Sequence, residues 1–185
     1  MNTVSRLKSE ELRGIGEDMY RMIVELYPIC RSITGNGYRQ TMRRIQEIIP
    51  ISIQEVPSGT EVFDWTIPKE WNIRDAYVTG PSGKKVIDFK QHNLHLMQYS
   101  VPVRLKMPLQ ELKHHLYSLP DHPEWIPYRT SYYKENWGFC LSQKQLHSLE
   151  EGEYEVVIES SLEDGYLTYG EYRIQGESDE EVLFS

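Results

Sequence analysis

The sequence predicts an α/β protein, and three observations support that fold class. Apolar residues recur at helical spacing over residues 9–27 and again over residues 38–49. Apolar residues alternate with glutamates over residues 153–159, which is typical of a half-buried strand. Ser142 and Gln145 have the spacing of a capping box, which predicts the start of a further helix.

The first part of the chain predicts helix, helix and strand. Pro28 lies near the end of the first helix, and the second helix stops before Pro50. Residues 32–37 form the turn between them, with Asn36 as the predicted N-cap. This turn also resembles an anion-binding helix N-terminus, because Arg31 and Arg39 flank it. It matches neither the P-loop nor the dinucleotide-binding fingerprint. A plain connection between two helices is the simpler interpretation.

The middle of the chain, residues 63–119, predicts a β-rich inserted domain. Its elements are strands at 74–79 and 85–89 joined by a Gly-Pro-Ser-Gly turn, an extended stretch at 97–105, and a leucine-striped helix opened by Pro108. We therefore expect residues 1–62 to begin the core domain. Residues 120–185 should continue it.

The last part of the chain predicts three strands. Residues 154–158 and 166–174 flank Asp164-Gly165, which we interpret as a tight turn, and residues 182–184 form a short apolar strand. We expect these strands and residues 51–56 to share one mostly buried sheet, with helices on its faces. An apolar strand at a chain end is a poor terminus, so we expect the chain to be the truncated first part of a longer protein.

Composition and charge argue against several classes of protein. Hydrophobic residues make up 39% of the 185 residues, enough for a packed core. From Glu150 onward there are 12 acidic residues and one basic residue, which argues against binding to nucleic acid or an anionic membrane. The N-terminus has no apolar run of a signal peptide, and two scattered cysteines suit reduced thiols, so we expect a cytoplasmic protein.

Candidate catalytic and metal-binding residues are sparse. The six histidines lack the spacing of a metal motif, and we predict no catalytic residue, no metal ligand and no specific zinc binding for this chain. Cys140 lies in the apolar run WGFCL, where burial raises the pKa of a thiol and makes it unreactive.

The aromatic segment 125–137 is the best candidate for ligand binding. Flat rings interleaved with Arg, Asn and hydroxyl groups suit a sugar, a peptide or another amide substrate. The residues that we expect to contact substrate are Arg129, Tyr132, Tyr133 and Trp137. The alternative is that these rings pack the inserted domain onto the core.

Four long strings together resemble bacterial aminopeptidase-like proteins of the zinc-dependent exopeptidase superfamily. They span nearly the whole chain: LYPICRSITGNG at 26–37, FDWTIPKEWNIRDA at 63–76, SYYKENWGFC at 131–140 and SSLEDGYLTYGE at 160–171. The resemblance implies a partial three-layer α/β/α exopeptidase core interrupted by a small β-rich domain. In such proteins the strand that resembles residues 182–185 leads into a loop carrying the first zinc ligand.

The resemblance implies that a complete family member is a zinc-dependent hydrolase of peptide or amide bonds. The zinc ligands and the catalytic carboxylate then come after the residues present here, so this chain alone is predicted to be inactive. A non-catalytic peptide- or carbohydrate-binding module, or an inactive remnant, is the alternative. No nucleic acid and no membrane is expected as a partner.

Overall fold

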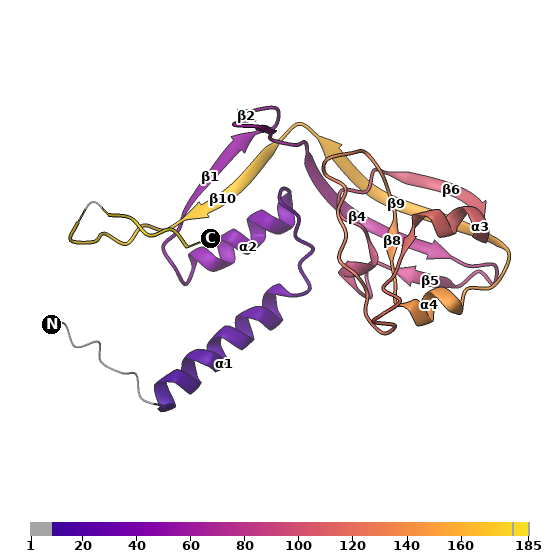
Figure 1. Cartoon of the computed structure of the whole chain (residues 1–185), viewed down its shortest axis with the longest axis horizontal. Helices are drawn as coiled ribbons and strands as arrows, with labels where there is room; N and C mark the ends of the chain where they lie inside the picture. The colour runs from indigo at the N-terminus through magenta and orange to yellow at the C-terminus, as the bar shows by residue number, and fades with distance from the viewer. Residues whose placement is uncertain (1–8, 179, 185) are drawn as a thin grey trace.

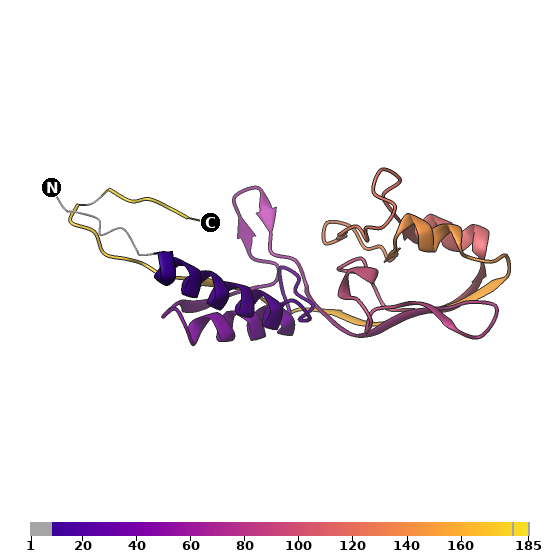
Figure 2. The same cartoon turned by 90° about the horizontal axis from the view of Figure 1, so that it is seen from below.

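The computed structural model describes residues 9–178 and 180–184, and these form two lobes (Figure 1). A long two-stranded ribbon, in which residues 52–79 run antiparallel to residues 153–171, passes from one lobe to the other. The first lobe holds the two N-terminal helices and a two-stranded sheet. The second lobe holds a four-stranded sheet with short helices on one face (Figure 2). The molecule is therefore a mixed α/β protein with several small sheets.

The first lobe begins as the sequence predicted. Its helices are α1 (Ser9–Leu26) and α2 (Asn36–Gln46), and its strands are β1 (Ser52–Pro57) and β10 (Tyr166–Glu171). β1 and β10 pair antiparallel from Ser52–Glu171 to Pro57–Tyr166. Asn36 is the first residue of α2 and not its N-cap. The cap position is Gly35, whose φ of 93° suits glycine because a side chain there would be strained.

The second lobe is built on one antiparallel sheet. Its strands, in spatial order, are β5 (Lys85–Asp88), β4 (Glu70–Thr79), β9 (Glu153–Glu163) and β6 (Val103–Pro108). β4 and β5 form the predicted hairpin, in which the Gly80 amide donates to the Lys84 carbonyl at 2.9 Å. Of the predicted extended stretch 97–105, only its last residues enter β6. The rest is irregular, with Tyr99 at a φ of 63°.

Short elements cover one face of this sheet, as Figure 2 shows. They are η1 (Asn93–His95), α3 (Leu109–Leu112), η2 (Lys113–His115), β7 (Leu116–Tyr117), β8 (Phe139–Cys140) and α4 (Gln143–His147). The predicted capping box is present, because the Ser142 hydroxyl accepts from the Gln145 amide and the Gln145 side chain accepts from the Ser142 amide. The leucine-striped helix is shorter than predicted, because Leu116 already lies in a strand.

The hydrophobic core lies between this sheet and its covering elements. Residues from β4, β9, α3 and β8 meet there, and several are fully buried, including Val78, Val156, Leu112, Phe139 and Leu141. Outside the core, a small hairpin of β2 (Glu61–Val62) and β3 (Trp65–Thr66) projects from the joint between the lobes (Figure 2).

The prediction of one buried sheet that unites four strands is wrong. β9 pairs with β4 and β6 in the second lobe, whereas β1 pairs with β10 in the first. The chain does not fold back at Asp164-Gly165, so β10 is not the partner of β9. It runs on, changing partners from β4 at Glu70–Glu163 to β1 at Pro57–Tyr166 (Figure 1).

Two contacts explain why the chain continues straight there. The Ser58 amide donates to the Gly165 carbonyl at 2.8 Å, and the Tyr166 amide donates to the Glu70 carboxylate at 3.1 Å. Gly165 does not adopt the positive φ that a type I′ hairpin turn needs. A Cβ at this position would lie 2.6 Å from the Cβ of Glu70, so the glycine serves close packing.

The predicted strand at 182–184 is also wrong. These residues lie outside any strand, and their side chains are 79–91% exposed. A strand needs a partner, and residues 182–184 take part in no ladder or bridge with the described residues. The domain limits at residues 62 and 119 stay predictions. Among the described helices, none is both long and apolar enough to cross a membrane.

Candidate functional site

The aromatic segment 125–137 runs across the second lobe between β7 and β8. It is held by backbone bonds to the irregular segment 97–101. The Gln98 amide donates to the Arg129 carbonyl at 2.9 Å, and the Ser131 amide donates back to the Gln98 carbonyl at 3.0 Å. The Val101 amide donates to the Asn136 carbonyl at 3.0 Å. The backbone that carries the predicted site residues is therefore fixed.

Trp137 is half-buried and lies flat against His115. Their ring centroids are 3.6 Å apart at an angle of 10°, and the Trp137 carbonyl lies 3.1 Å from His115 Nδ1. The indole also packs against the hydrophobic core. This geometry favours the packing alternative for Trp137.

The two adjacent tyrosines differ in exposure. Tyr132 is half-buried and meets the buried ring of Tyr99 edge to face, with centroids 5.8 Å apart. Tyr133 is 79% exposed, and its centroid lies 4.3 Å from that of Tyr132. Tyr132 thus supports Tyr133, and Tyr133 presents its ring and hydroxyl to solvent.

Arg129 is exposed, and its guanidinium lies over the Tyr117 ring at 4.4 Å from the ring centroid. A stacked guanidinium keeps its edge N–H groups available for a carboxylate. Neither of two surface hollows found in the described part of the chain is lined by any of the four predicted residues. Their role as substrate contacts stays a prediction.

One of these hollows, of about 410 Å³, lies where the connection between α1 and α2 meets the start of β4. Ser32, Asn36 and Trp71 are among its lining residues. The Ser32 hydroxyl is buried and has no hydrogen-bond partner in the described structure. The hollow includes the turn that we compared with an anion-binding helix N-terminus.

The groups that an anion would need at this turn are already used. The Asn36 amide donates to the Asn72 side chain at 2.7 Å, so one of the free amides of α2 is capped. Arg39 donates to both oxygens of Glu70, at 2.7 and 2.6 Å, and to Glu55 at 2.6 Å. These contacts favour the interpretation of the turn as a plain connection between two helices.

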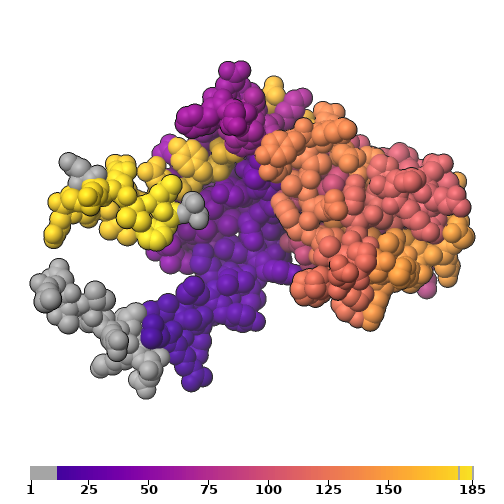
Figure 3. Space-filling view, viewed as in Figure 1, coloured from indigo at the N-terminus to yellow at the C-terminus, as the bar shows by residue number. Residues whose placement is uncertain are grey.

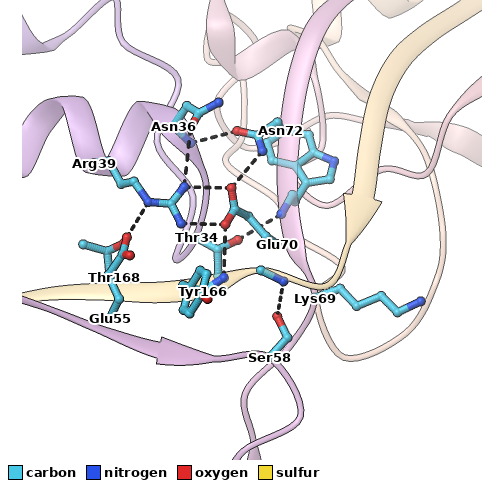
Figure 4. A network of polar contacts seen from close by, with 12 residues as sticks. Thr34, Asn36, Arg39, Glu55, Ser58, Lys69, Glu70, Asn72, Tyr166 and Thr168 are labelled. Carbon is cyan, nitrogen blue, oxygen red and sulfur yellow. Dashed lines mark hydrogen bonds and ion pairs between the residues drawn. The ribbon is translucent and has the colours of Figure 1, made fainter.

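These contacts belong to a polar network at the joint between the lobes, which Figure 4 shows. Glu70 is its centre, because its carboxylate also accepts from the Tyr166 amide and from the Asn72 side chain. Next to it, the Thr34 hydroxyl accepts from the Trp71 amide at 3.1 Å and lies 2.6 Å from the Tyr99 hydroxyl. The network connects α2, β1, β4 and β10.

The electrostatics follow from this geometry. The hydrogen bonds from Arg39 lower the pKa of Glu70 to about 2, against the opposing effect of burial. Glu70 in turn raises the pKa of Arg39 above its ordinary value. Side-chain exposure is 14% for Glu70 and 16% for Arg39, so this is a bidentate and largely desolvated ion pair. The sequence marked Arg39 as a flanking residue, but nothing in it linked Arg39 with a glutamate 31 residues away.

The two thiols and His95 are buried or half-buried, and burial shifts the pKa of each. Burial raises the pKa of the Cys140 thiol to about 12 and that of Cys30 to about 11, so both stay protonated near neutral pH. Cys140 is fully buried, as its apolar neighbours predicted. His95 is buried with Nδ1 2.7 Å from the Cys140 carbonyl, and burial lowers its pKa. Over residues 9–178 and 180–184, no three His, Cys, Asp or Glu side chains gather in a way that could hold a metal ion.

Residues 70–161, which run from the start of β4 nearly to the end of β9, match a family model described as "Domain of unknown function (DUF2172)". This part of the chain is therefore similar to DUF2172. The matched region coincides with the second lobe, shown as the right-hand, largely orange part of Figure 3, and we call this lobe the DUF2172 lobe after the model that it matches.

Two comparisons reach beyond this domain into the first lobe. The chain is 61% identical, over 170 residues, to a Clostridium acetobutylicum protein named "Putative polysaccharide biosynthesis protein with aminopeptidase-like domain". It also resembles a solved structure at 2.37 Å of a "putative peptidase" from Clostridium acetobutylicum, with a TM-score of 0.85 and 61% identity. The matches cover 92% and 89% of this chain.

The chain spans 39% of the length of each of these relatives. Both lobes thus match relatives that are named as a peptidase and as carrying an aminopeptidase-like domain. The wider resemblance to aminopeptidase-like proteins is thus supported.

Proposed function

We propose that this chain forms the substrate-facing and scaffolding part of a zinc-dependent hydrolase of peptide or amide bonds. The observation that supports the proposal is the 61% identity to proteins named as a peptidase and as carrying an aminopeptidase-like domain. The proposal includes the three-layer α/β/α core as the architecture of the complete protein. A cytoplasmic location stays a prediction.

The described residues do not fit a zinc site, since no three suitable side chains come together among them. We therefore assign the zinc of a complete family member to residues beyond the ones described, and no step of the reaction to this chain. What this chain contributes is binding. Tyr133 and Arg129 are the groups best placed for it, because both are exposed on a backbone that hydrogen bonds fix.

The substrate class follows from the chemistry of these two groups. A guanidinium with free N–H groups binds a carboxylate, and an exposed tyrosine ring stacks on a flat peptide group or the apolar face of a sugar. The name of one relative joins polysaccharide biosynthesis to an aminopeptidase-like domain. We therefore include an amide bond carried on a sugar in the substrate class.

The test uses a chimera in which this chain replaces the matching part of the Clostridium acetobutylicum relative. We expect the chimera to release product from aminoacyl p-nitroanilides or from an N-acylated amino sugar, to lose activity with a chelator and to regain it with zinc. The chain alone should release nothing. A folded chimera that retains zinc and hydrolyses neither substrate class would contradict the proposal and favour a non-catalytic binding module.

Substitutions in the chimera test the binding role. Tyr133→Ala and Arg129→Ala should each raise KM by about tenfold at an unchanged melting temperature. Lys134→Ala, an exposed neighbour on the same turn, is the matched control and should change neither value. Trp137→Ala should lower the melting temperature instead, because its indole packs on His115 and the core. Unchanged KM in both Tyr133 and Arg129 variants would remove this segment from the substrate site.

A further inference from the structure

Helix α1 carries an apolar stripe that the described chain leaves uncovered. Its members recur at helical spacing: Leu12, Ile15, Met19, Met22, Ile23 and Leu26. Leu12 is 55% exposed, Ile15 46%, Met19 61% and Ile23 60%. Helices in water owe most of their stability to packing of such a face. The stripe therefore needs a partner.

The contacts that α1 makes with the rest of the described chain gather at its C-terminal end. Arg44 of α2 donates to Glu25 at 2.7 Å, the Tyr27 hydroxyl lies 2.9 Å from His92, and Asn93 donates to the Tyr27 carbonyl. Met22 and Leu26 are half-buried, whereas the stripe from Leu12 to Met19 is open to solvent. Figure 1 shows this half of the helix leading away from α2.

The small sheet next to these helices is also open. Among the residues that the structure describes, β1 and β10 pair only with each other, apart from one isolated bridge between Thr34 and Leu167. α2 contacts β10 on one face, while Tyr169 is 42% exposed on the other. A two-stranded sheet is marginally stable in water and gains stability when strands or helices are added.

We propose that the α1 stripe and the open β1–β10 sheet form one docking face for a folded body equivalent to the unmatched remainder of the Clostridium acetobutylicum relative. In that relative the same fold, at a TM-score of 0.85, is part of a chain of which the matched region is only 39%. The docking face would meet an apolar surface of that body. The inference concerns assembly and requires no catalysis.

The make-up of the open face, which combines a helix with the edges of a sheet, favours this occupant over a second copy of the chain. A second copy pairing through α1 would cover the stripe and leave the edges of the small sheet unpaired. A larger body can pack a helix or strand against both at once. When it is part of one polypeptide, it also has the advantage of a high effective concentration.

The test mixes the chain with the unmatched remainder of the relative, produced as a separate polypeptide, and also compares the chain alone with the full-length chimera, in which the two parts are one polypeptide. We expect a one-to-one complex in analytical ultracentrifugation. Met19→Glu should weaken it by about tenfold or more, because a charge enters the apolar contact. Arg21→Glu places the same side chain on the polar face of α1, where Arg21 is 77% exposed, and should leave affinity within about twofold.

A labelling experiment locates the contact. In a Cys30→Ser background, Met19→Cys should react with a thiol reagent about tenfold more slowly in the complex than in the free chain, and Arg21→Cys equally in both. Equal labelling of Met19→Cys in the free chain and in the full-length chimera would overturn the proposal. A homodimer that Met19→Glu dissolves, without binding to the remainder, would overturn it in favour of a second copy. Because binding is measured without substrate, the outcome is independent of the hydrolysis test.

Discussion

The two lobes bury their apolar side chains to very different degrees. In the second lobe Val78, Val156, Phe139 and Leu141 are fully buried, whereas in the first lobe Leu12, Ile23 and Ile48 are more than half exposed. The difference arises from the segments that pack against each sheet. The four-stranded sheet is covered by segments of its own lobe, whereas the two-stranded sheet and α1 have apolar surface left over.

The difference separates a lobe with a closed hydrophobic core from a lobe that leaves much apolar surface exposed. The DUF2172 lobe has a closed core and should fold cooperatively. The helical lobe should depend on the polar network at the joint and on the partner that we propose. Substitutions in matched pairs, one in each lobe, measure this contrast.

Leucine-to-alanine substitutions should show the largest difference in stability between the two lobes. Leu141→Ala removes a fully buried side chain and should lower the free energy of unfolding by about 2–5 kcal/mol. Leu12→Ala in α1 should change it by about 0.5 kcal/mol or less, because Leu12 is 55% exposed. Chemical denaturation followed by tryptophan fluorescence provides both values. Equal losses would mean that α1 is packed in solution.

The ion pair at the joint should have the next largest effect. Glu70→Gln leaves Arg39 without its bidentate partner and should destabilise the protein by about 2 kcal/mol, less than for a fully buried pair. Because the pKa of Glu70 is about 2 in the folded state, against an ordinary 4.5, its stabilising effect is present above pH 4.5 and is lost as the pH falls towards 2.

Denaturation at several pH values checks this sign. Wild type should lose stability on acidification by more than Glu70→Gln does, and hydrogen exchange should show the first lobe opening before the second. Arg74→Gln is a control, since its pair with Glu159 involves an arginine side chain that is 82% exposed. Parallel acid profiles for wild type and Glu70→Gln would contradict the role of Glu70.

Gly165→Ala should lower the free energy of unfolding by about 1–2 kcal/mol, because the new methyl group would meet Glu70 at the point where the ribbon passes between the lobes. Gly176→Ala adds the same group where the nearest atom is 3.9 Å away, and should be close to neutral. Thermal unfolding of both variants measures the difference. An unaffected Gly165→Ala protein would mean that the ribbon adapts at little cost.

Loss of the α4 cap should have the smallest effect. Ser142→Ala removes the hydroxyl that accepts from the Gln145 amide and should lower the free energy of unfolding by about 1 kcal/mol. Ser82→Ala, an exposed serine in the turn between β4 and β5, should cost much less. A loss confined to local exchange around α4 would show that the second lobe tolerates fraying at its edge.

The sequence predicted those elements whose signals are local. The α1 stripe, the β4–β5 hairpin and the capping box at Ser142 each depend on neighbours within a few residues. Strand partners were not predictable in the same way. Asp164-Gly165 has the composition of a hairpin turn, but contacts with Ser58 and Glu70, far away in the chain, keep it extended.

The candidate site was predictable in composition and not in geometry. The aromatic segment was found from its residue types alone. Which ring packs and which is exposed depends on His115 and Tyr99, two residues outside the segment. The Arg39–Glu70 pair joins residues of different lobes, and no spacing rule within one element reveals such a contact.

The register of the ribbon makes the second lobe removable in principle. Pro57 and Tyr166 are Cα partners across β1 and β10, so the chain leaves the first lobe and returns to it at adjacent points. A short hairpin loop could therefore replace residues 58–165 and still connect the two strands. The DUF2172 lobe is thus inserted between two residues that pair across neighbouring strands. Such an insertion can be excised, transplanted or exchanged for another module.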